Sequence, residues 1–228
     1  RLTTNPVSPL GRKPNQSQSG TAFQAVMQNP HGQDAHATYQ PLTPRPNKML
    51  TLVAGVDLGG TTASLALADL DGTIVHENKI APESYGGPQR VLERIAEGIL
   101  KLAEDAGEKP AAVGLGLPGL VDMDDGTSKF MPNLPTNWVD VEVSQILSTL
   151  IGCPVKLIND ARAATLGELR FGHGREADSL ALFTLGTGIG GGIAIDGKLR
   201  LGPIGAAGEF GHLAVLPYGP MCGCGNRG

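Results

Sequence analysis

The chain has 228 residues, of which 40% are hydrophobic and 18% are charged, so it holds enough apolar material for one large domain or two small ones. The 18 basic and 22 acidic residues leave a net charge of −4, which provides no positive field for nucleic acid or an anionic membrane. No run of about 18 apolar residues occurs, so no membrane-spanning helix is expected. Three cysteines without the spacing of a secreted disulfide scaffold favour a cytoplasmic protein.

Residues 1–48 differ in composition from the rest of the chain. They contain seven prolines and many asparagines and glutamines, without a sustained apolar period. Such a segment cannot bury enough surface to offset its chain entropy, so a disordered tail is expected. Met49 stands directly before the first predicted strand, and the upstream residues are equally explained by a wrongly assigned start site.

Regular patterns begin at residue 49. Apolar runs and alternation predict strands over 50–56, 62–69 and 73–80, joined by tight turns into an antiparallel meander. Apolar residues at helical spacing then predict a helix over 88–106, which stops at Gly107.

The second part of the chain ends with a pattern that resembles its beginning. The sequence first predicts a strand over 111–117, a helix over 143–151, a strand over 155–158 and a helix over 161–171. Three further strands are expected, over 180–184, 191–195 and 198–201. Because they again form a strand, a glycine turn, a strand, a hairpin and a strand, the sequence indicates an internal duplication.

The first glycine turn carries groups that can bind phosphate. The segment reads Asp57-Leu58-Gly59-Gly60-Thr61-Thr62 and joins two strands, whereas Walker and dinucleotide loops open a helix. Glycines let backbone N–H groups approach phosphate oxygens, and threonine hydroxyls add donors. Asp57, at the strand end, is placed to hold Mg²⁺ through water. Taken alone, the segment is also explained by an ordinary hairpin turn.

A second glycine–threonine turn strengthens this interpretation. Gly186, Thr187 and Gly188 again join two strands, so the two hairpins can face each other across a cleft and hold one nucleotide. Gly190 supports this less, because a glycine-rich strand also allows close packing.

Two polar segments lie between and after the turns. Asn159-Asp160 ends a predicted strand and begins a helix, so Asp160 is either a helix N-cap or a group presented to the cleft. Phosphoryl transfer to a hydroxyl needs a carboxylate that orients the nucleophile and accepts its proton. Glu209 and His212 follow the second turn, and Cys222-Gly223-Cys224 comes ten residues after the histidine.

With these motifs in order, residues 49–228 resemble the ROK family of sugar kinases and repressors, in particular its bacterial glucokinases. The resemblance also rests on Pro118-Gly119 and on Pro132-Asn133-Leu134 with Trp138. It implies an α/β protein with an actin-like ATPase (ribonuclease H-like) fold, in which two similar domains enclose a cleft. The N-terminal domain would span 49–172, and 173–228 would begin an incomplete second domain.

The family resemblance also implies roles for individual residues. Asp160 would take the proton from a sugar C6 hydroxyl, and the sugar would be bound by Asp160 together with Gly119, Asn133, Asn159, Glu209 and His212. ATP would be held by Asp57, Gly59, Gly60, Thr61, Thr62, Gly186, Thr187 and Gly188, with Mg²⁺ neutralising its charge. A structural Zn²⁺ would be held by His212, Cys222 and Cys224, and by a third cysteine expected just after Gly228.

The expected function is therefore ATP-dependent phosphorylation of a hexose, first of all glucose to glucose 6-phosphate. Kinases of N-acetylglucosamine, N-acetylmannosamine, mannose or fructose stay open. A sugar-binding protein without catalysis is disfavoured, because Asp160 and both glycine loops are intact. A sugar-responsive repressor of this family would carry a winged helix-turn-helix ahead of the kinase-like part. Residues 1–48 are too short, too proline-rich and not basic enough to form one. Relatives continue for about a hundred residues, so this chain would be a fragment with little activity. The full-length protein is expected to form a homodimer or homotetramer.

Overall fold

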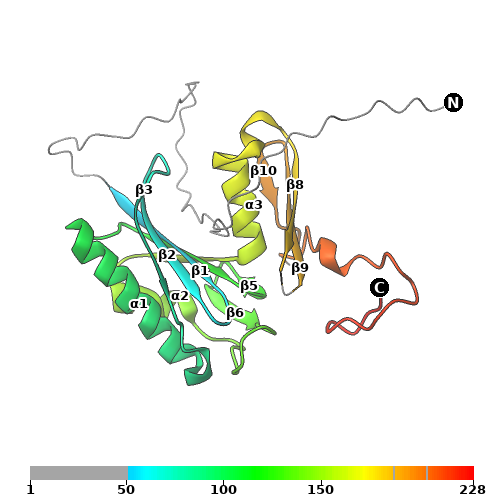
Figure 1. Cartoon of the computed structure of the whole chain (residues 1–228), viewed down its shortest axis with the longest axis horizontal. Coiled ribbons are helices and arrows are strands. Elements are labelled where there is room, and N and C mark those ends of the chain that lie inside the picture. Colours follow the sequence, from blue (N-terminus) through cyan, green and yellow to red (C-terminus); the bar gives the residue numbers. More distant parts are fainter. Residues whose placement is uncertain (1–50, 187, 204) are drawn as a thin grey trace, which may run out of the picture.

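The computed structural model describes residues 51–186, 188–203 and 205–228, which form two larger β-sheets and a two-stranded one, with helices between and beside the larger sheets (Figure 1). The predictions for residues 1–48 lie outside these described residues. The first sheet begins with β1 (Leu52–Leu58), β2 (Ala63–Asp69) and β3 (Ile74–Ile80). Their antiparallel pairing confirms the predicted meander.

Two later strands extend this sheet on the other side of β1. β4 (Val113–Leu117) runs parallel to β1, and β7 (Val155–Asn159) runs parallel to β4, which gives the order β3-β2-β1-β4-β7. Parallel neighbours require long crossover connections. The helices α1 (Gly87–Ala106) and α2 (Val143–Ile151) lie in these connections, as the apolar spacing predicts.

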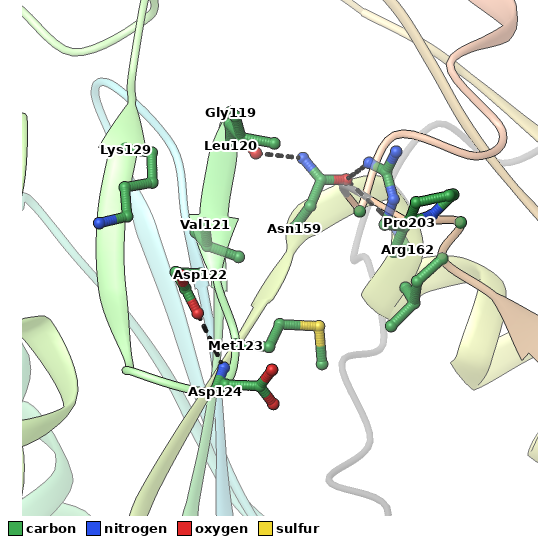
Figure 2. A pocket seen from close by; sticks show the side chains of 13 residues that line it. Gly119, Leu120, Val121, Asp122, Met123, Asp124, Lys129, Asn159, Arg162 and Pro203 are labelled. Atoms are coloured by element: carbon green, nitrogen blue, oxygen red, sulfur yellow. Dashed lines mark hydrogen bonds between the residues drawn. The ribbon is translucent and has the colours of Figure 1, made fainter.

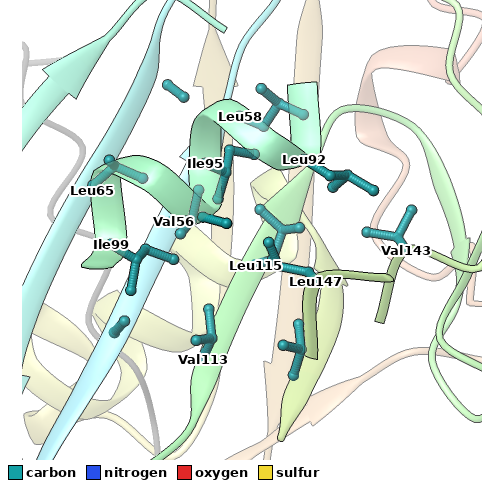
Figure 3. Close-up of a cluster of buried hydrophobic side chains, with 14 of the residues drawn as sticks. Val56, Leu58, Leu65, Leu92, Ile95, Ile99, Val113, Leu115, Val143 and Leu147 are labelled. Atoms are coloured by element: carbon teal, nitrogen blue, oxygen red, sulfur yellow. The ribbon is translucent and has the colours of Figure 1, made fainter. Parts of the chain in front are cut away.

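The main core lies between this sheet and the pair α1 and α2, which pack against each other (Figure 3). Central strands β1 and β4 are buried along almost their whole length, because they have neighbours on both sides. The apolar face of α1 completes the layer, and Gly107 ends that helix with a left-handed φ of 67°. Fully buried members of the core include Val56, Leu65, Leu92, Ile95, Ile99, Leu115 and Leu147.

A short hairpin follows Pro118-Gly119 and was not predicted. It consists of β5 (Leu120–Asp122) and β6 (Thr127–Phe130), strands of three and four residues that are too short to show an alternation. Buried Ser128 attaches the hairpin to the segment before α2, since its amide donates to the Val141 carbonyl at 3.1 Å and its carbonyl accepts from the Asp140 amide at 2.8 Å.

The second sheet repeats the meander of the first. β8 (Leu180–Leu185), β9 (Ile189–Ile195) and β10 (Lys198–Arg200) pair antiparallel in the order β10-β9-β8, which corresponds to β3-β2-β1. This common order agrees with the duplication indicated by the sequence. Short 3₁₀ turns occur at Ser84–Gly86, His173–Glu176 and Phe210–His212.

The helix α3 (Asp160–Phe171) begins at the end of β7 and packs against β8 and β9 of the second sheet (Figure 1). Glycines of β9 make this close approach possible. A methyl group at Gly192 would lie 2.2 Å from Thr165 Oγ1, and one at Gly190 would lie 3.1 Å from Ala161 Cβ. Gly190 therefore allows close packing between β9 and α3, which is one of the two interpretations that the sequence left open for it. No helix within the described residues is long and apolar enough to span a membrane.

Candidate active site and metal cluster

The end of β7 and the first turn of α3 form the centre of the candidate site. Asn159 is the N-cap of α3, because its side-chain oxygen accepts the Arg162 amide hydrogen at 3.2 Å. Its Nδ2 donates to the Gly119 carbonyl at 2.9 Å, so the predicted Pro118-Gly119 turn and the Asn159-Asp160 pair lie together (Figure 2). Asp160 is then the first helical residue, and its interpretation as the N-cap is wrong.

Arg162 belongs to the same site and was missed by the sequence analysis. Although it is only 3% exposed, its guanidinium has three polar partners. Nη1 donates to Asn159 Oδ1 at 2.9 Å, and Nη2 lies 2.9 Å from Glu209 Oε1 and 3.2 Å from the Ala207 carbonyl. The sequence contained one signal that could have identified it. Arg162 lies in the first turn of the predicted helix, and the positions on both sides of it are alanines.

Glu209 and His212 reach this centre from the second sheet. The turn Phe210–His212 is fixed to that sheet, because the Phe210 ring stacks on Phe183 with centroids 4.7 Å apart. Glu209 can therefore meet Arg162, and its other oxygen lies 3.8 Å from His212 Nε2. The structure thus brings Gly119, Asn159, Glu209 and His212 into one continuous group of contacts.

Asp160 stands beside this group and is partly buried. Burial is the main cause that raises the pKa of its carboxyl group, and the negative charge of Glu209 raises it further. The Ala161 amide, which donates to Asp160 Oδ1 at 2.8 Å, opposes this rise, as do Arg162 and Asn159. A carboxylate with a raised pKa is a better proton acceptor than an ordinary surface aspartate.

The first predicted phosphate loop is a tight turn between β1 and β2. The Gly59 amide donates to the Thr62 carbonyl at 2.9 Å, while Thr61 and Thr62 are exposed. Buried Ser84 is not part of the turn but stabilises it, because its hydroxyl donates to the Gly60 carbonyl at 2.7 Å. Asp57 stands partly exposed at the end of β1.

Asn133 lies next to this first loop. A methyl group on Gly60 would stand 3.1 Å from the Asn133 carbonyl oxygen. The second loop connects β8 to β9, and the Gly186 amide donates to the Gly188 carbonyl at 2.9 Å. Gly186 and Gly188 are exposed with open space around them, whereas the predicted Thr187 lies outside the described residues.

His212, Cys222 and Cys224 form a cluster that can hold a metal ion. One ligand atom from each lies within 4.8 Å of the others, and His212 Nδ1 is 3.7 Å from Cys222 Sγ. Zinc bonds of about 2.1 to 2.3 Å at tetrahedral angles place neighbouring ligands about 3.6 Å apart, which matches this separation. Hydrogen bonds from the backbone and thiol of Cys224 lower the pKa of Cys222, which favours the thiolate that binds metal.

A cavity of about 450 Å³ opens on one side of the same centre. Gly119, Asn159 and Arg162 form part of its wall (Figure 2). The rest of the lining comes from the β5–β6 hairpin and from Leu201, Gly202, Pro203 and Gly205. The hairpin contributes Asp122, Asp124 and Lys129 to the lining, so the wall carries both signs of charge.

Comparison with known families identifies the group of proteins. The sequence model of the ROK family matches residues 53–228. The chain belongs to the ROK family. Its similarity to solved ROK kinases also confirms the expected α/β, actin-like ATPase fold. The crystal structure of a ROK family glucokinase from Streptomyces griseus, in complex with glucose and AMPPNP, has a TM-score of 0.69 and 40% identity, over 78% of this chain and 55% of that one.

Curated relatives include enzymes and a regulator. A glucokinase of Thermotoga maritima is 45% identical over 174 residues, which are 76% of this chain and 54% of the relative. A putative xylose repressor of a Caldicellulosiruptor species is 34% identical over 185 residues, which are 80% of this chain and 46% of the relative. The chain thus spans about half the length of the curated relatives that it matches.

Proposed function

We propose that the whole protein is an ATP-dependent hexose kinase that phosphorylates the C6 hydroxyl, with glucose as the first candidate substrate. The observation that carries this proposal is the position of Asp160 at the N-terminus of α3. Its carboxyl group stands beside the contacts that join Gly119, Asn159, Arg162 and Glu209. The similarity to a glucokinase that binds glucose and AMPPNP supports the same reaction.

In the proposed reaction, Asp160 accepts the proton of the sugar C6 hydroxyl as its oxygen bonds to the γ-phosphorus of ATP. The bond between that phosphorus and the oxygen bridging to the β-phosphate breaks, and ADP leaves with the electron pair. Asn159, Glu209, His212, Asn133 and the Gly119 backbone would hold the other hydroxyls. This positioning converts a bimolecular encounter into a reaction between oriented groups.

The two glycine turns would bind the nucleotide. Exposed Thr61 and Thr62 provide hydroxyl donors, and open space around Gly186 and Gly188 allows close approach of phosphate oxygens. Asp57 fits an oxygen ligand for Mg²⁺, since hard cations prefer carboxylate and water. The ion would neutralise the negative charge of the triphosphate.

The cluster of His212, Cys222 and Cys224 fits zinc by donor type and by spacing. His212 would use Nδ1 for the metal, which leaves Nε2 toward Glu209. Such a carboxylate beside a ligating histidine fixes the orientation of its ring. Zinc would thus hold His212 and Glu209, two of the predicted sugar-binding residues, in place. The cytoplasmic location and the homo-oligomeric state stay predictions.

The test uses the complete protein with ATP and a panel of glucose, mannose, fructose, N-acetylglucosamine and N-acetylmannosamine. Formation of ADP and sugar phosphate is expected, with the highest kcat/KM for glucose. Asp160→Asn should lower kcat by about 100-fold or more, because it removes the proton acceptor, but should leave the sugar Kd within a few-fold. Asp196→Asn is the matched control, since Asp196 is exposed in the β9–β10 turn and its left-handed φ of 53° suits asparagine. Unchanged turnover in Asp160→Asn would remove Asp160 from this role.

A sugar-responsive repressor is the second candidate, and the putative xylose repressor among the relatives favours it. It would need sugar binding but no proton acceptor. The complete protein can be tested by DNA-shift assay with the upstream region of its own gene, with and without sugar. Sugar-dependent DNA binding together with no phosphorylation of any hexose would favour the repressor over the kinase.

A further inference from the structure

Arg162 connects two of the predicted sugar-binding side chains. It comes from the first turn of α3, whereas Glu209 comes from the turn beside the second sheet. The Arg162 side chain is only 4% exposed, so its charge is removed from water and needs partners. Its contacts with Asn159 and Glu209 therefore link the two sheets at the candidate site.

The contact with Asn159 fixes the orientation of an amide group. A side-chain amide has one acceptor oxygen with two lone pairs and two N–H donors. Asn159 Oδ1 accepts from the Arg162 amide at 3.2 Å and from Arg162 Nη1 at 2.9 Å, so both lone pairs are used. One N–H donates to the Gly119 carbonyl at 2.9 Å. The Asn159 side chain also hydrogen-bonds the Asp160 carboxyl group, so its N–H groups are directed to Gly119 and Asp160 while Arg162 occupies its oxygen.

The contact with Glu209 holds a carboxyl group in place. Glu209 Oε1 lies 2.9 Å from Arg162 Nη2, and this charge-assisted hydrogen bond fixes the position of that oxygen. Arg162 thus sets the orientation of both the Asn159 amide and the Glu209 carboxyl group.

We propose that Arg162 is a positioning residue for the sugar, which fixes the orientation of the Asn159 amide and of the Glu209 carboxyl group. This inference rests on the proposed kinase function. Arg162 acts through its two neighbours. A lysine could not replace it, because a single ammonium group lacks the planar fork that reaches both side chains at once.

Asp160 provides a readout that separates charge from geometry. The charged groups that act on it are Glu209, which raises its pKa, and Arg162, which lowers it. The strands β4, β8 and β9 that pack against α3 carry no titratable side chain. Lys156 on β7 and Lys198 and Arg200 on β10 are exposed, as are His173, Arg175 and Glu176 of the 3₁₀ turn that follows α3. Removing the Arg162 charge should therefore move the acid limb of the pH–rate profile upward.

The experiment compares Arg162→Lys with Arg162→Gln in the complete protein. Arg162→Lys keeps the charge and loses the fork, so the sugar KM should rise about tenfold while the acid limb stays in place. Arg162→Gln keeps donors for Asn159 and loses the charge, so the acid limb should move to higher pH. Arg170→Lys and Arg170→Gln, at the exposed end of α3, are matched controls and should change neither quantity. Equal changes in both Arg162 variants, or no change in either, would overturn the proposal.

A second measurement keeps the proposal testable if Arg162→Gln folds poorly. The double variant Arg162→Gln/Glu209→Gln removes both charges that act on Asp160, so the acid limb should return toward that of the parent protein. An acid limb that stays at the position of the single variant would contradict the proposal.

Urea denaturation of the parent, Arg162→Gln, Glu209→Gln and the double variant gives the coupling between Arg162 and Glu209 without any catalytic assay. A coupling of about tenfold or more in the unfolding equilibrium is expected, and additive effects would overturn the arrangement. If the parent protein binds no hexose in calorimetry, the kinase proposal fails, while this coupling still reports on Arg162 and Glu209 by itself.

Discussion

At the scale of single residues, Asp160 shows a conflict between stability and chemistry. Its carboxyl group is removed from water at the start of α3, and Glu209 adds a second negative charge nearby. Both effects favour the protonated form, so the ionised form that could accept a proton is unfavourable for the folded state. Among the described residues, the Ala161 amide, Asn159 and Arg162 compensate for it in part. Such a compromise is typical of catalytic groups.

Asp160→Asn is therefore expected to stabilise the protein at neutral pH. Because the folded state raises the pKa of Asp160, it holds the proton more tightly than the unfolded chain does. The free energy of unfolding then decreases as pH rises from the ordinary aspartate value, about 3.9, through the raised value. Thermal unfolding should show a higher Tm for the variant at pH 7 and a smaller difference near pH ~4. A lower Tm at pH 7 would contradict the raised pKa.

At the scale of elements, the phosphate loop depends on a neighbour far along the chain. The Ser84 hydroxyl, 24 residues from Gly60, holds the carbonyl of that glycine inside the turn. Loss of this bond would leave a carbonyl without its partner and let the loop move. The loop between β1 and β2 is thus supported by the 3₁₀ turn that leads into α1.

Ser84→Ala should raise the KM for ATP several-fold in the complete protein and lower the stability by about 1 kcal/mol, since it removes one buried hydrogen bond. Ser148→Ala is a matched control, because the Ser148 hydroxyl also donates to a carbonyl, that of Cys153 at 2.8 Å, at the end of α2. The control should lose similar stability with an unchanged KM for ATP. Equal KM values in both variants would exclude a role of Ser84 in the loop.

The glycines of β9 have a different function from those of the loops. Gly192 lies so close to Thr165 that a methyl group would overlap the Thr165 side chain. Gly192→Ala should therefore displace α3 and lower the stability by about 1 to 3 kcal/mol, as overpacking does. Urea denaturation can measure this loss, with Gly188→Ala, which meets open space, as the control. If Gly192→Ala loses no more stability than the control, α3 adjusts to the added methyl group without a cost in free energy, and the prediction fails.

At the scale of the whole molecule, the two sheets meet at α3 and at the Arg162–Glu209 ion pair. The first sheet has a continuous core with α1 and α2. On the second sheet, large apolar side chains stay exposed, including Phe183 at 57% and Leu185 at 81%. Within the described residues, the region around Glu209 and His212 has few buried apolar side chains, and a metal ion would add to its stability.

Zinc removal is expected to lower the stability of the complete protein. The parent protein should contain about one zinc per chain by elemental analysis, and Cys222→Ser or Cys224→Ser should lose most of it together with several degrees of Tm. Cys153→Ser is the control. Burial raises the pKa of the Cys153 thiol, which lies outside the cluster, so its variant should keep the metal. Equal zinc contents in all variants would contradict the site.

The sequence by itself determined the local features of this protein. The apolar periods located the α1, α2 and α3 helices and the two meanders, because secondary structure follows from neighbouring residues. The glycine turns and Asn159-Asp160 were recognisable for the same reason. The hairpin β5–β6 was not, since its short strands are held by hydrogen bonds to residues 140 and 141.

Only the tertiary structure decided how the candidate site is assembled. Arg162 meets the Ala207 carbonyl across 45 positions of the chain, and Asn159 meets the Gly119 carbonyl across 40. No local pattern encodes such contacts. The first arises when α3 packs on the glycines of β9 and brings two sheets together, and the second arises when β4 and β7 pair in the first sheet. The role of Gly190 in packing and the ion pair of Arg162 with Glu209 depend on the packing of α3 on β9. The family and the residue types were visible in the sequence, whereas the partners of each side chain required the fold.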